Sequence, residues 1–338
     1  MRSSDEALGT LIASKIEDGN LRAAVRIICS DESMAPDNDQ TYQELCLKHP
    51  QTNLGSAAII SQTDCKPFQV TEQNVLDAVR SFPAGSSGGP DGVRPKHIQD
   101  IVGCPSHGRE ALAALTALVN LLLKGKCPPD IKRILFGARL LALTKRSGGI
   151  RPIAVGYTWR RLAAKCANVY AVTKLSDLFQ PMQLGVGVKG GCKAAVHASR
   201  RLVTNMPEGW VIAKLDFTNA FNTLRRDRML QAVSDAVPEL LPFCQLAYQD
   251  PSVLAYGCRS VMSCEGVQQG DPLGPLLFSL TIHPILESMK SPVKFGYLDD
   301  ITEAGPEFSV EKDIVRLEHD SSDIGLTLNV SKCELIYQ

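Results

Sequence analysis

Apolar residues recur at helical spacing along much of this chain. In residues 110–124, Leu112, Leu115 and Val119 fall on one helical face, which predicts an amphipathic helix. Thr71 is a predicted N-cap for another helix. Further helices are expected over residues 7–28, 72–82, 158–175, 192–202, 225–236, 240–248, 276–289 and 310–323.

Short runs rich in β-branched and aromatic residues lie between these helices. Residues 134–143 and 150–155 flank a Thr-Lys-Arg-Ser-Gly-Gly turn, which predicts a β-hairpin with basic residues at its tip. Further strands are expected over residues 210–216, 293–297 and 326–330. This mixture predicts an α+β fold, in which a small antiparallel sheet has helices packed behind it.

Two adjacent carboxylates, Asp299 and Asp300, follow the apolar run 293–297 at the tip of a predicted hairpin. Neighbouring like charges repel, and Mg²⁺ relieves the repulsion by taking carboxylate oxygens as ligands. A solvated acidic turn is the alternative explanation for such a pair. Asp216 ends an apolar strand, where a carboxylate is costly to bury unless it is paired or bound to a cation. It is therefore the natural third ligand, or else the cap of the following helix.

The formal net charge is zero, but the charge is unevenly distributed. Residues 124–165 contain eleven Lys or Arg residues against the single acid Asp130, a net charge of +10. Such a segment suits phosphate groups, although a solvated basic face has the same composition. Within it, Lys145 and Arg151 lie on or beside the hairpin turn, where they would act as charge-assisted donors to a triphosphate.

Several function classes are disfavoured. No apolar run approaches the ~20 residues needed to span a bilayer. The first six residues lack the features of a signal peptide, so we expect an intracellular protein, in the nucleus or cytoplasm, without a membrane partner. The eleven cysteines include no Cys-x-x-Cys pair, which argues against a zinc ribbon. Residues 185–190 match a dinucleotide-binding fingerprint, but no buried strand is predicted before them. The glycine-rich loop 85–93 is either a linker or a close approach for nucleic acid.

Five motifs, in order, resemble those of a reverse transcriptase. The three catalytic motifs of that family are similar to Lys214-Leu-Asp-Phe-Thr-Asn-Ala-Phe-Asn222, Gln268-Gln-Gly-Asp-Pro-Leu-Gly-Pro275 and Tyr297-Leu-Asp-Asp300. A fourth motif and the basic motif of the fingers subdomain are similar to Gly325-Leu-Thr-Leu-Asn-Val-Ser-Lys-Cys333 and Gly149-Ile-Arg-Pro-Ile153. The variant that the chain resembles most is the non-LTR (LINE-type) retrotransposon enzyme, through Gly88-Gly-Pro-Asp-Gly-Val-Arg-Pro95, Arg151-Pro-Ile153 and Asn329-Val-Ser-Lys-Cys333.

The resemblance implies an RNA-directed DNA polymerase that extends a primer 3′-hydroxyl by two-metal phosphoryl transfer, in the service of DNA integration. Its implied partners are an RNA template, a DNA primer and deoxynucleoside triphosphates. Two Mg²⁺ ions, with Mn²⁺ as a substitute, would be bound by Asp216, Asp299, Asp300 and the backbone carbonyl of Phe217. The other implied roles are triphosphate binding by Lys145 and Arg151, contact with nucleotide and template by Gln269 and Gly270, and neutralisation or protonation of pyrophosphate by Lys332.

Phe221, five residues after Asp216, matches the aromatic residue with which the family excludes a ribose 2′-hydroxyl. This match implies deoxynucleotide substrates. A core phenylalanine on the following helix is the alternative explanation. For Lys332, the alternative is an ordinary surface lysine.

By the same resemblance, the chain divides into an extension with little chemistry of its own (1–65), a fingers subdomain (66–180) and a palm (181–338). The family continues beyond its fourth motif into a helical thumb, which we expect to be absent here, so that duplex is held weakly. A non-catalytic, nucleic-acid-binding remnant of a retroelement enzyme is therefore the alternative to an active polymerase. A viral RNA-dependent RNA polymerase is least favoured, because it would carry an acid in place of Phe221.

Overall fold

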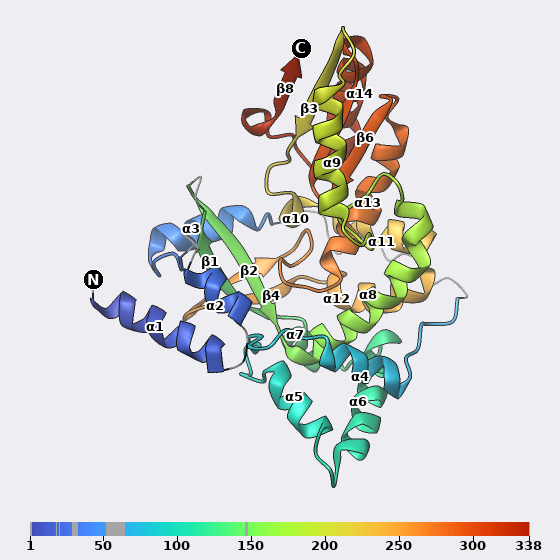
Figure 1. Ribbon diagram of the computed structural model, residues 1–338. Coiled ribbons are helices and arrows are strands. Elements are labelled where there is room, and N and C mark those ends of the chain that lie inside the picture. The colour runs from blue at the N-terminus through green and yellow to red at the C-terminus, as the bar shows by residue number, and fades with distance from the viewer. Residues whose placement is uncertain are drawn as a thin grey trace.

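The computed structural model describes residues 2–17, 19, 21–28, 33–51, 65–145 and 148–337 (Figure 1). Its α-helices are α1 (Arg2–Glu17), α2 (Leu21–Ile28), α3 (Asp39–Lys48), α4 (Glu72–Arg80), α5 (Pro95–Val102), α6 (Gly108–Leu123), α7 (Pro129–Leu135), α8 (Thr158–Phe179), α9 (Gly191–Thr204), α10 (Ala220–Thr223), α11 (Arg226–Ala236), α12 (Leu241–Tyr248), α13 (Gly274–Ser288) and α14 (Glu307–Asp323). The 3₁₀ helices are η1 (Pro238–Leu240) and η2 (Val330–Lys332). The strands are β1 (Ala138–Thr144), β2 (Ile150–Gly156), β3 (Trp210–Leu215), β4 (Ser252–Tyr256), β5 (Arg259–Ser263), β6 (Val293–Tyr297), β7 (Asp300–Pro306) and β8 (Glu334–Tyr337). The predicted α+β class is confirmed.

One sheet, which we call the palm sheet, has antiparallel strands in the order β6-β7-β3-β8. Helices α13 and α14 pack against it, and α9 packs against β6 (Figure 1). The register pairs Leu215, the last residue of β3, with Ile301 of β7. Asp216 is therefore brought to the edge of the sheet at which the β6–β7 turn carries Asp299 and Asp300.

A second sheet, the fingers sheet, has the order β2-β1-β4-β5. The predicted basic hairpin is confirmed, because β1 and β2 pair antiparallel from Ala138–Gly156 to Thr144–Ile150. Strand β4 pairs in parallel with β1, and β4 and β5 form a hairpin that was not predicted. This hairpin closes through Gly257, whose φ of 54° suits the tight turn. Leu45 of α3 is fully buried against this sheet.

The main core lies where α4, α6, α8, α11, α12 and α13 meet. In α8, Ala163, Ala164, Ala167 and Ala171 are all fully buried, and their small side chains let neighbouring helices approach closely. The apolar α13 crosses this core and holds the loop that precedes it. Across the part of the chain described here, no helix combines the length and apolar character needed to cross a bilayer.

A buried acidic cluster joins the palm sheet to α14. Glu303 of β7 is fully buried, and its Oε2 lies 3.0 Å from the hydroxyl of Ser291, which also lies 2.7 Å from Oδ2 of Asp313. Burial raises the pKa of Glu303 to about 8; the Ser291 hydroxyl and the charge of Lys294 oppose this rise, and the charge of Asp313 adds to it. Glu303 is thus expected to be protonated in the folded protein near neutral pH.

Some sequence-based boundaries are wrong. Residues 326–330 form no strand, and Leu328 makes only an isolated bridge to Phe217. On the side of β3 opposite β7, the strand that pairs with it is the unpredicted β8. Residues 134 and 135 belong to α7, which begins at Pro129, where a missing N–H costs nothing. The helix expected over 7–28 is two helices, α1 and α2. The predicted boundary between fingers and palm near residue 180 stays a prediction. Strands β4 and β5 follow that boundary in the chain, and they belong to the fingers sheet.

Candidate active site

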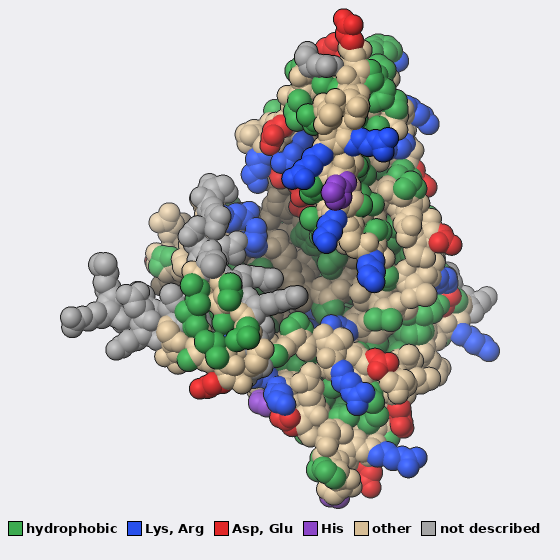
Figure 2. All heavy atoms as spheres, viewed as in Figure 1, with side chains coloured by type: hydrophobic (Ala, Val, Ile, Leu, Met, Phe, Trp, Pro, Cys, Tyr) green, Lys and Arg blue, Asp and Glu red, His purple; other side chains and the backbone are tan. Residues whose placement is uncertain are grey.

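All the residues given roles above line one cleft between the palm sheet and the β1–β2 hairpin. The cleft has a volume of about 700 Å³, and Figure 2 shows the hollow beside α9. The palm side contributes Asp216, Phe217, Phe221, Asp299, Asp300 and Lys332; the hairpin contributes Lys145 and Arg151; the loop before α13 contributes Gln269 and Gly270. The structure therefore brings together residues from all five motifs, while their individual roles stay predictions.

Asp216 follows the last residue of β3 and faces the cleft. Its Oδ1 atom is buried and accepts no hydrogen bond, although Lys332 Nζ lies 3.7 Å away. Its backbone carbonyl accepts a hydrogen bond from Asn329 N at 2.8 Å, which ties the middle of the fourth motif to the first motif. A buried carboxylate oxygen without a donor is energetically unfavourable unless a cation approaches it.

Asp299 and Asp300 follow a strained turn. Leu298 has a φ of 61°, in the left-handed region that costs a side chain-bearing residue about 1–2 kcal/mol. Burial raises the pKa of both carboxyls; repulsion from Asp300 and Asp216 adds to the rise for Asp299, and repulsion from Asp216 adds to that for Asp300. The three carboxylates therefore interact across the cleft.

Gln183 holds this turn in place. Its side chain is fully buried, and its Oε1 accepts hydrogen bonds from Leu298 N at 2.9 Å and from Gly185 N at 3.1 Å. Its Nε2 donates to the carbonyl of Leu298 at 3.4 Å. Backbone bonds of Leu184 and Met182 to Gly296 extend the same junction. The left-handed Leu298 is thus fixed from both sides of its peptide unit.

The donors in the cleft have the chemistry of a divalent-cation site. Carboxylate oxygens are the ligands that Mg²⁺ prefers, and Asp216 Oδ1 is buried with no hydrogen-bond partner. Among the residues that the structure describes, however, no three His, Cys, Asp or Glu side chains lie close enough to form a metal-binding group. The carboxylates are therefore suitable ligands for Mg²⁺, but their side chains do not lie close enough together to form a coordination sphere.

The opposite wall of the cleft is basic. Burial lowers the pKa of Lys145, and repulsion from Lys48, Lys332 and Arg151 lowers it further, while Asp216 opposes the shift. Repulsion among cations is relieved when they share an anion. This wall is therefore suited to phosphate oxygens.

A buried network positions the loop that carries Gln269 and Gly270. Arg160 of α8 is only 2% exposed, and its guanidinium donates to Asp271 Oδ2 at 2.8 Å and to Gln268 Oε1 at 2.6 Å. The Tyr248 hydroxyl donates to the same Asp271 oxygen at 2.6 Å. The carbonyl of Gln269 accepts from Ala154 N of β2 at 2.7 Å, which ties the loop to the fingers hairpin.

The two phenylalanines of the first motif differ in exposure. Phe217 is buried, whereas Phe221 is half-buried and stacks on Phe278, with ring centroids 4.8 Å apart. Phe221 thus packs on the core and also lines the cleft, so both explanations given for it are compatible with its position.

Gly270, which also lines the cleft, has a steric requirement for glycine, because its φ is 129° and a Cβ there would meet Ala154 O at 2.4 Å.

The basic segment 124–165 does not form one surface. Arg160 is buried against Asp271, and Lys132 pairs with Asp250 at 2.5 Å. Arg161 donates to Ser87 O at 2.6 Å within the glycine-rich loop, which is held against α8 and is not a free linker. The interpretation of the +10 segment as a single phosphate-binding region is therefore wrong; within it, Lys145 and Arg151 line the cleft.

A basic helix face lies beside the cleft instead. Lys193, His197 and Arg200 are exposed and spaced four and three residues apart on α9, so they share one face. Residues 180–207 contain no Asp or Glu. Figure 2 shows Lys, Arg and His side chains following α9 next to the hollow. This face has the charge that a nucleic-acid backbone requires.

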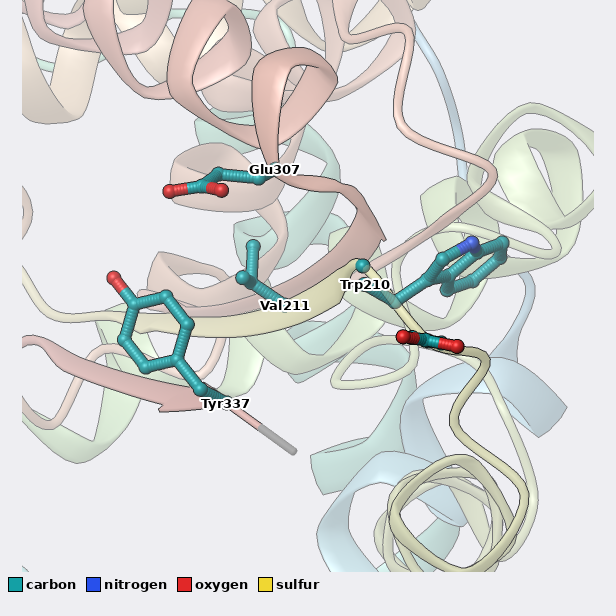
Figure 3. Close-up of a pocket in the computed structure, with 6 residues that line it drawn as sticks. Trp210, Val211, Glu307 and Tyr337 are labelled. Carbon is teal, nitrogen blue, oxygen red and sulfur yellow. The ribbon is translucent and has the colours of Figure 1, made fainter.

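A smaller pocket lies at the far end of the palm sheet, away from the aspartates. It has a volume of about 380 Å³ and is lined by Trp210 and Val211 of β3, Glu307 of α14 and Tyr337 of β8 (Figure 3). It contains none of the predicted site residues. The cleft, rather than this pocket, is the candidate active site.

A family model described as "Reverse transcriptase (RNA-dependent DNA polymerase)" matches residues 143–338. The match covers more than half of the chain and includes all three aspartates. The chain belongs to the reverse transcriptase family. The polymerase motifs predicted from residue 149 onward all fall within the matched part of the chain.

Two similar proteins are encoded by retrotransposable elements. "Retrotransposable element SLACS 132 kDa protein" of Trypanosoma brucei gambiense is 25% identical over 276 residues, which cover 78% of this chain and 23% of that protein. "Retrovirus-related Pol polyprotein from type-2 retrotransposable element R2DM" of Drosophila melanogaster is 26% identical over 338 residues, covering 90% of this chain and 30% of that protein. The predicted likeness to non-LTR retrotransposon reverse transcriptases is confirmed, and the chain spans less than a third of the length of each of these two proteins.

Among solved structures, apo telomerase from Candida tropicalis has a TM-score of 0.47 and 10% identity, over 62% of this chain and 46% of that chain.

The cleft also contains residues that the sequence did not indicate, among them Lys48, Asn219 and Asn329. Asn219 has a φ of 54°, and its Nδ2 donates to the carbonyl of Lys48 at 2.7 Å. The two asparagines lie inside recognised motifs, so a closer examination of these motifs could have found them. Lys48 lies in the extension that was expected to have little chemistry, and it lines the cleft.

Proposed function

We propose that this chain is an RNA-directed DNA polymerase that adds deoxynucleotides to the 3′-hydroxyl of a DNA primer. One observation carries the proposal: Asp216, Asp299 and Asp300 lie at one edge of the palm sheet, facing Lys145 and Arg151 across a single cleft. This arrangement, in a member of the reverse transcriptase family, pairs acidic donors for cations with basic donors for phosphates.

The three aspartates and the carbonyl of Phe217 would hold two Mg²⁺ ions, with Mn²⁺ as a substitute. When bound, such ions activate the attacking hydroxyl and stabilise the leaving pyrophosphate. The raised pKa values of Asp299 and Asp300 favour this assignment, because repulsion among carboxylates is relieved by a cation.

The remaining residues bind and orient the substrates. Lys145 and Arg151 hold the triphosphate, and Gln269 and Gly270 border the incoming base and the template. Phe221, braced by its stack on Phe278, limits the space for a ribose 2′-hydroxyl. The ammonium of Lys332 lies 3.7 Å from Oδ1 of Asp216. From this position Lys332 would neutralise or protonate pyrophosphate.

The partners we propose are an RNA template, a DNA primer and deoxynucleoside triphosphates, with the basic face of α9 as a contact for the nucleic-acid backbone. Since both relatives carry the names of retrotransposable elements, we propose that this chain copies such an element in the nucleus or cytoplasm as a step toward DNA integration.

Primer extension tests the proposal. The purified chain is given a poly(rA) template annealed to oligo(dT), with Mg²⁺ and dTTP, beside the Asp299→Ala, Asp300→Ala double variant. Asp100→Ala, an exposed carboxylate on α5, is the control. We expect extension by the parent and the control and none by the double variant. Extension by the double variant at the parent's rate would refute the site.

A non-catalytic nucleic-acid-binding protein is the second candidate, and one observation favours it. Among the described residues, the carboxylates do not form a group that holds a metal. In that case neither the parent nor the double variant would extend the primer, while fluorescence anisotropy would still show binding of the labelled duplex. Mn²⁺ in place of Mg²⁺ gives a second opportunity to detect extension by the parent.

A further inference from the structure

Helix α3 brings a lysine into the catalytic cleft from outside the part of the chain that matches the family model. That match begins at residue 143, whereas Lys48 is the last residue of α3. Lys48 lines the cleft together with Lys145 and Asp216. The position of this side chain is therefore a property of the tertiary structure that the family's motifs do not include.

Three contacts fix α3 against the site. Leu45 is fully buried in the core of the fingers sheet. Glu44 Oε1 accepts a hydrogen bond from Ile150 N, the first residue of β2, at 2.8 Å. The carbonyl of Lys48 accepts from Asn219 Nδ2 at 2.7 Å, within the loop that follows Asp216. The helix thus bridges the basic hairpin and the aspartate loop, and it holds Lys48 between them.

The charge of Lys48 is poorly neutralised within the protein. Its ammonium lies 3.8 Å from Glu44 Oε1, the same oxygen that accepts the stronger bond from Ile150 N. The Lys48 side chain is 24% exposed, so it is only partly hydrated. Among neighbouring charges, it has the largest effect in lowering the pKa of Lys145. Two lysines that repel each other within a cleft are stabilised by an anion that contacts both.

We propose that Lys48 binds a phosphate group in the cleft jointly with Lys145. The proposal rests on the proposed polymerase function and extends its phosphate-binding site to a residue of the N-terminal extension. The phosphate belongs either to the triphosphate of the incoming nucleotide or to the backbone of a nucleic-acid strand, and both sources present the same oxyanion. The competing explanation is a lysine that stabilises the last turn of its own helix.

The test compares Lys48→Met, which removes the charge but keeps the length, with Lys48→Arg, which restores it. Lys96→Met is the matched control, because Lys96 on α5 also forms an i,i+4 ion pair, with Asp100 at 2.8 Å, but lies outside the cleft. For each chain, single-nucleotide extension gives KM for dTTP and kcat. Equilibrium dialysis gives the affinity for dTTP with Mg²⁺, and anisotropy across a salt titration gives the affinity for an RNA–DNA duplex.

If the phosphate is that of the nucleotide, Lys48→Met raises KM and the dialysis Kd for dTTP roughly tenfold, with kcat changed less. If it belongs to a strand, the variant instead weakens duplex binding and lowers the salt slope by about one. Lys48→Arg keeps most of the affinity in either case. Unchanged affinity for both ligands in Lys48→Met refutes the proposal.

The two proposals fail separately. A parent that does not extend the primer contradicts the polymerase function, while dialysis and anisotropy still measure the role of Lys48. A loss of affinity accompanied by a lowered free energy of unfolding relative to Lys96→Met indicates a structural role and also refutes the proposal. The free energy of unfolding is obtained from urea titration of all three variants.

Discussion

Replacing Gln183 with leucine tests how the catalytic turn is held. Leucine has a similar volume but removes the Oε1 acceptor of Leu298 N and Gly185 N, and the Nε2 donor to the carbonyl of Leu298. The left-handed backbone of Leu298, with a φ of 61° in the parent, then lacks the bonds that hold it there. Asp299 follows directly, so a change in this turn moves a predicted metal ligand.

The expected magnitude follows from the groups left unpaired. A buried N–H that loses its acceptor costs about 1–3 kcal/mol, and two partly buried N–H groups are affected here. The left-handed residue stores about 1–2 kcal/mol of strain, and its release when the turn changes conformation offsets part of this loss. We therefore expect the free energy of unfolding to fall by about 2–4 kcal/mol and the rate of primer extension to fall roughly 10- to 100-fold.

Urea unfolding at 25 °C measures the first quantity, and single-turnover extension at saturating dTTP measures the second. The control is Gln73→Leu, which removes an exposed glutamine on α4 with one bond to Asp77 and should change stability by less than about 0.5 kcal/mol. If Gln183→Leu unfolds at the same urea concentration as the parent and extends primers at the same rate, Gln183 does not hold the turn. A loss of stability without a loss of rate would show that Leu298 is fixed by other contacts.

Three further predictions concern other parts of the molecule. Because burial raises the pKa of Glu303 to about 8, from 4.5 in the unfolded chain, its contribution to stability is complete below pH 4.5 and is lost as pH rises toward 8. Between pH 6 and 8 the parent should therefore lose roughly 2 kcal/mol more than Glu303→Gln in urea unfolding, whereas the exposed-site control Glu311→Gln should follow the parent. Phe221→Ala should admit ribonucleotides in primer extension, and unchanged sugar discrimination would contradict its assigned role. Arg160→Met should lower the free energy of unfolding by about 3–5 kcal/mol, because it leaves Asp271 buried without its cation; a loss below about 1 kcal/mol would show that the pair is dispensable.

Much of the fold follows from local patterns. The helix over 108–123 and the β1–β2 hairpin were predicted closely, because apolar spacing and turn residues act within a few neighbouring positions. Strand β8 was not predicted, because its exposed residues acquire strand geometry only by pairing with β3. The β4–β5 hairpin was missed although Gly257 marks its turn.

The sequence by itself determined which residues are candidates for the chemistry. Acids at the ends of apolar runs and cations at a hairpin turn are recognisable without coordinates, because a buried charge needs a partner wherever the chain places it. Their assembly into one cleft depended on the register of β3 with β7 and on the bond between Ala154 and Gln269. Only the tertiary structure decided that Arg160 is buried while Lys145 faces the cleft, since both lie in the same basic segment. It also brought Lys48 of α3 to within the same cleft as Asp216, 168 positions later in the chain. Contacts between segments so distant in sequence depend on packing against a shared core. The local pattern of apolar and polar residues does not determine that packing.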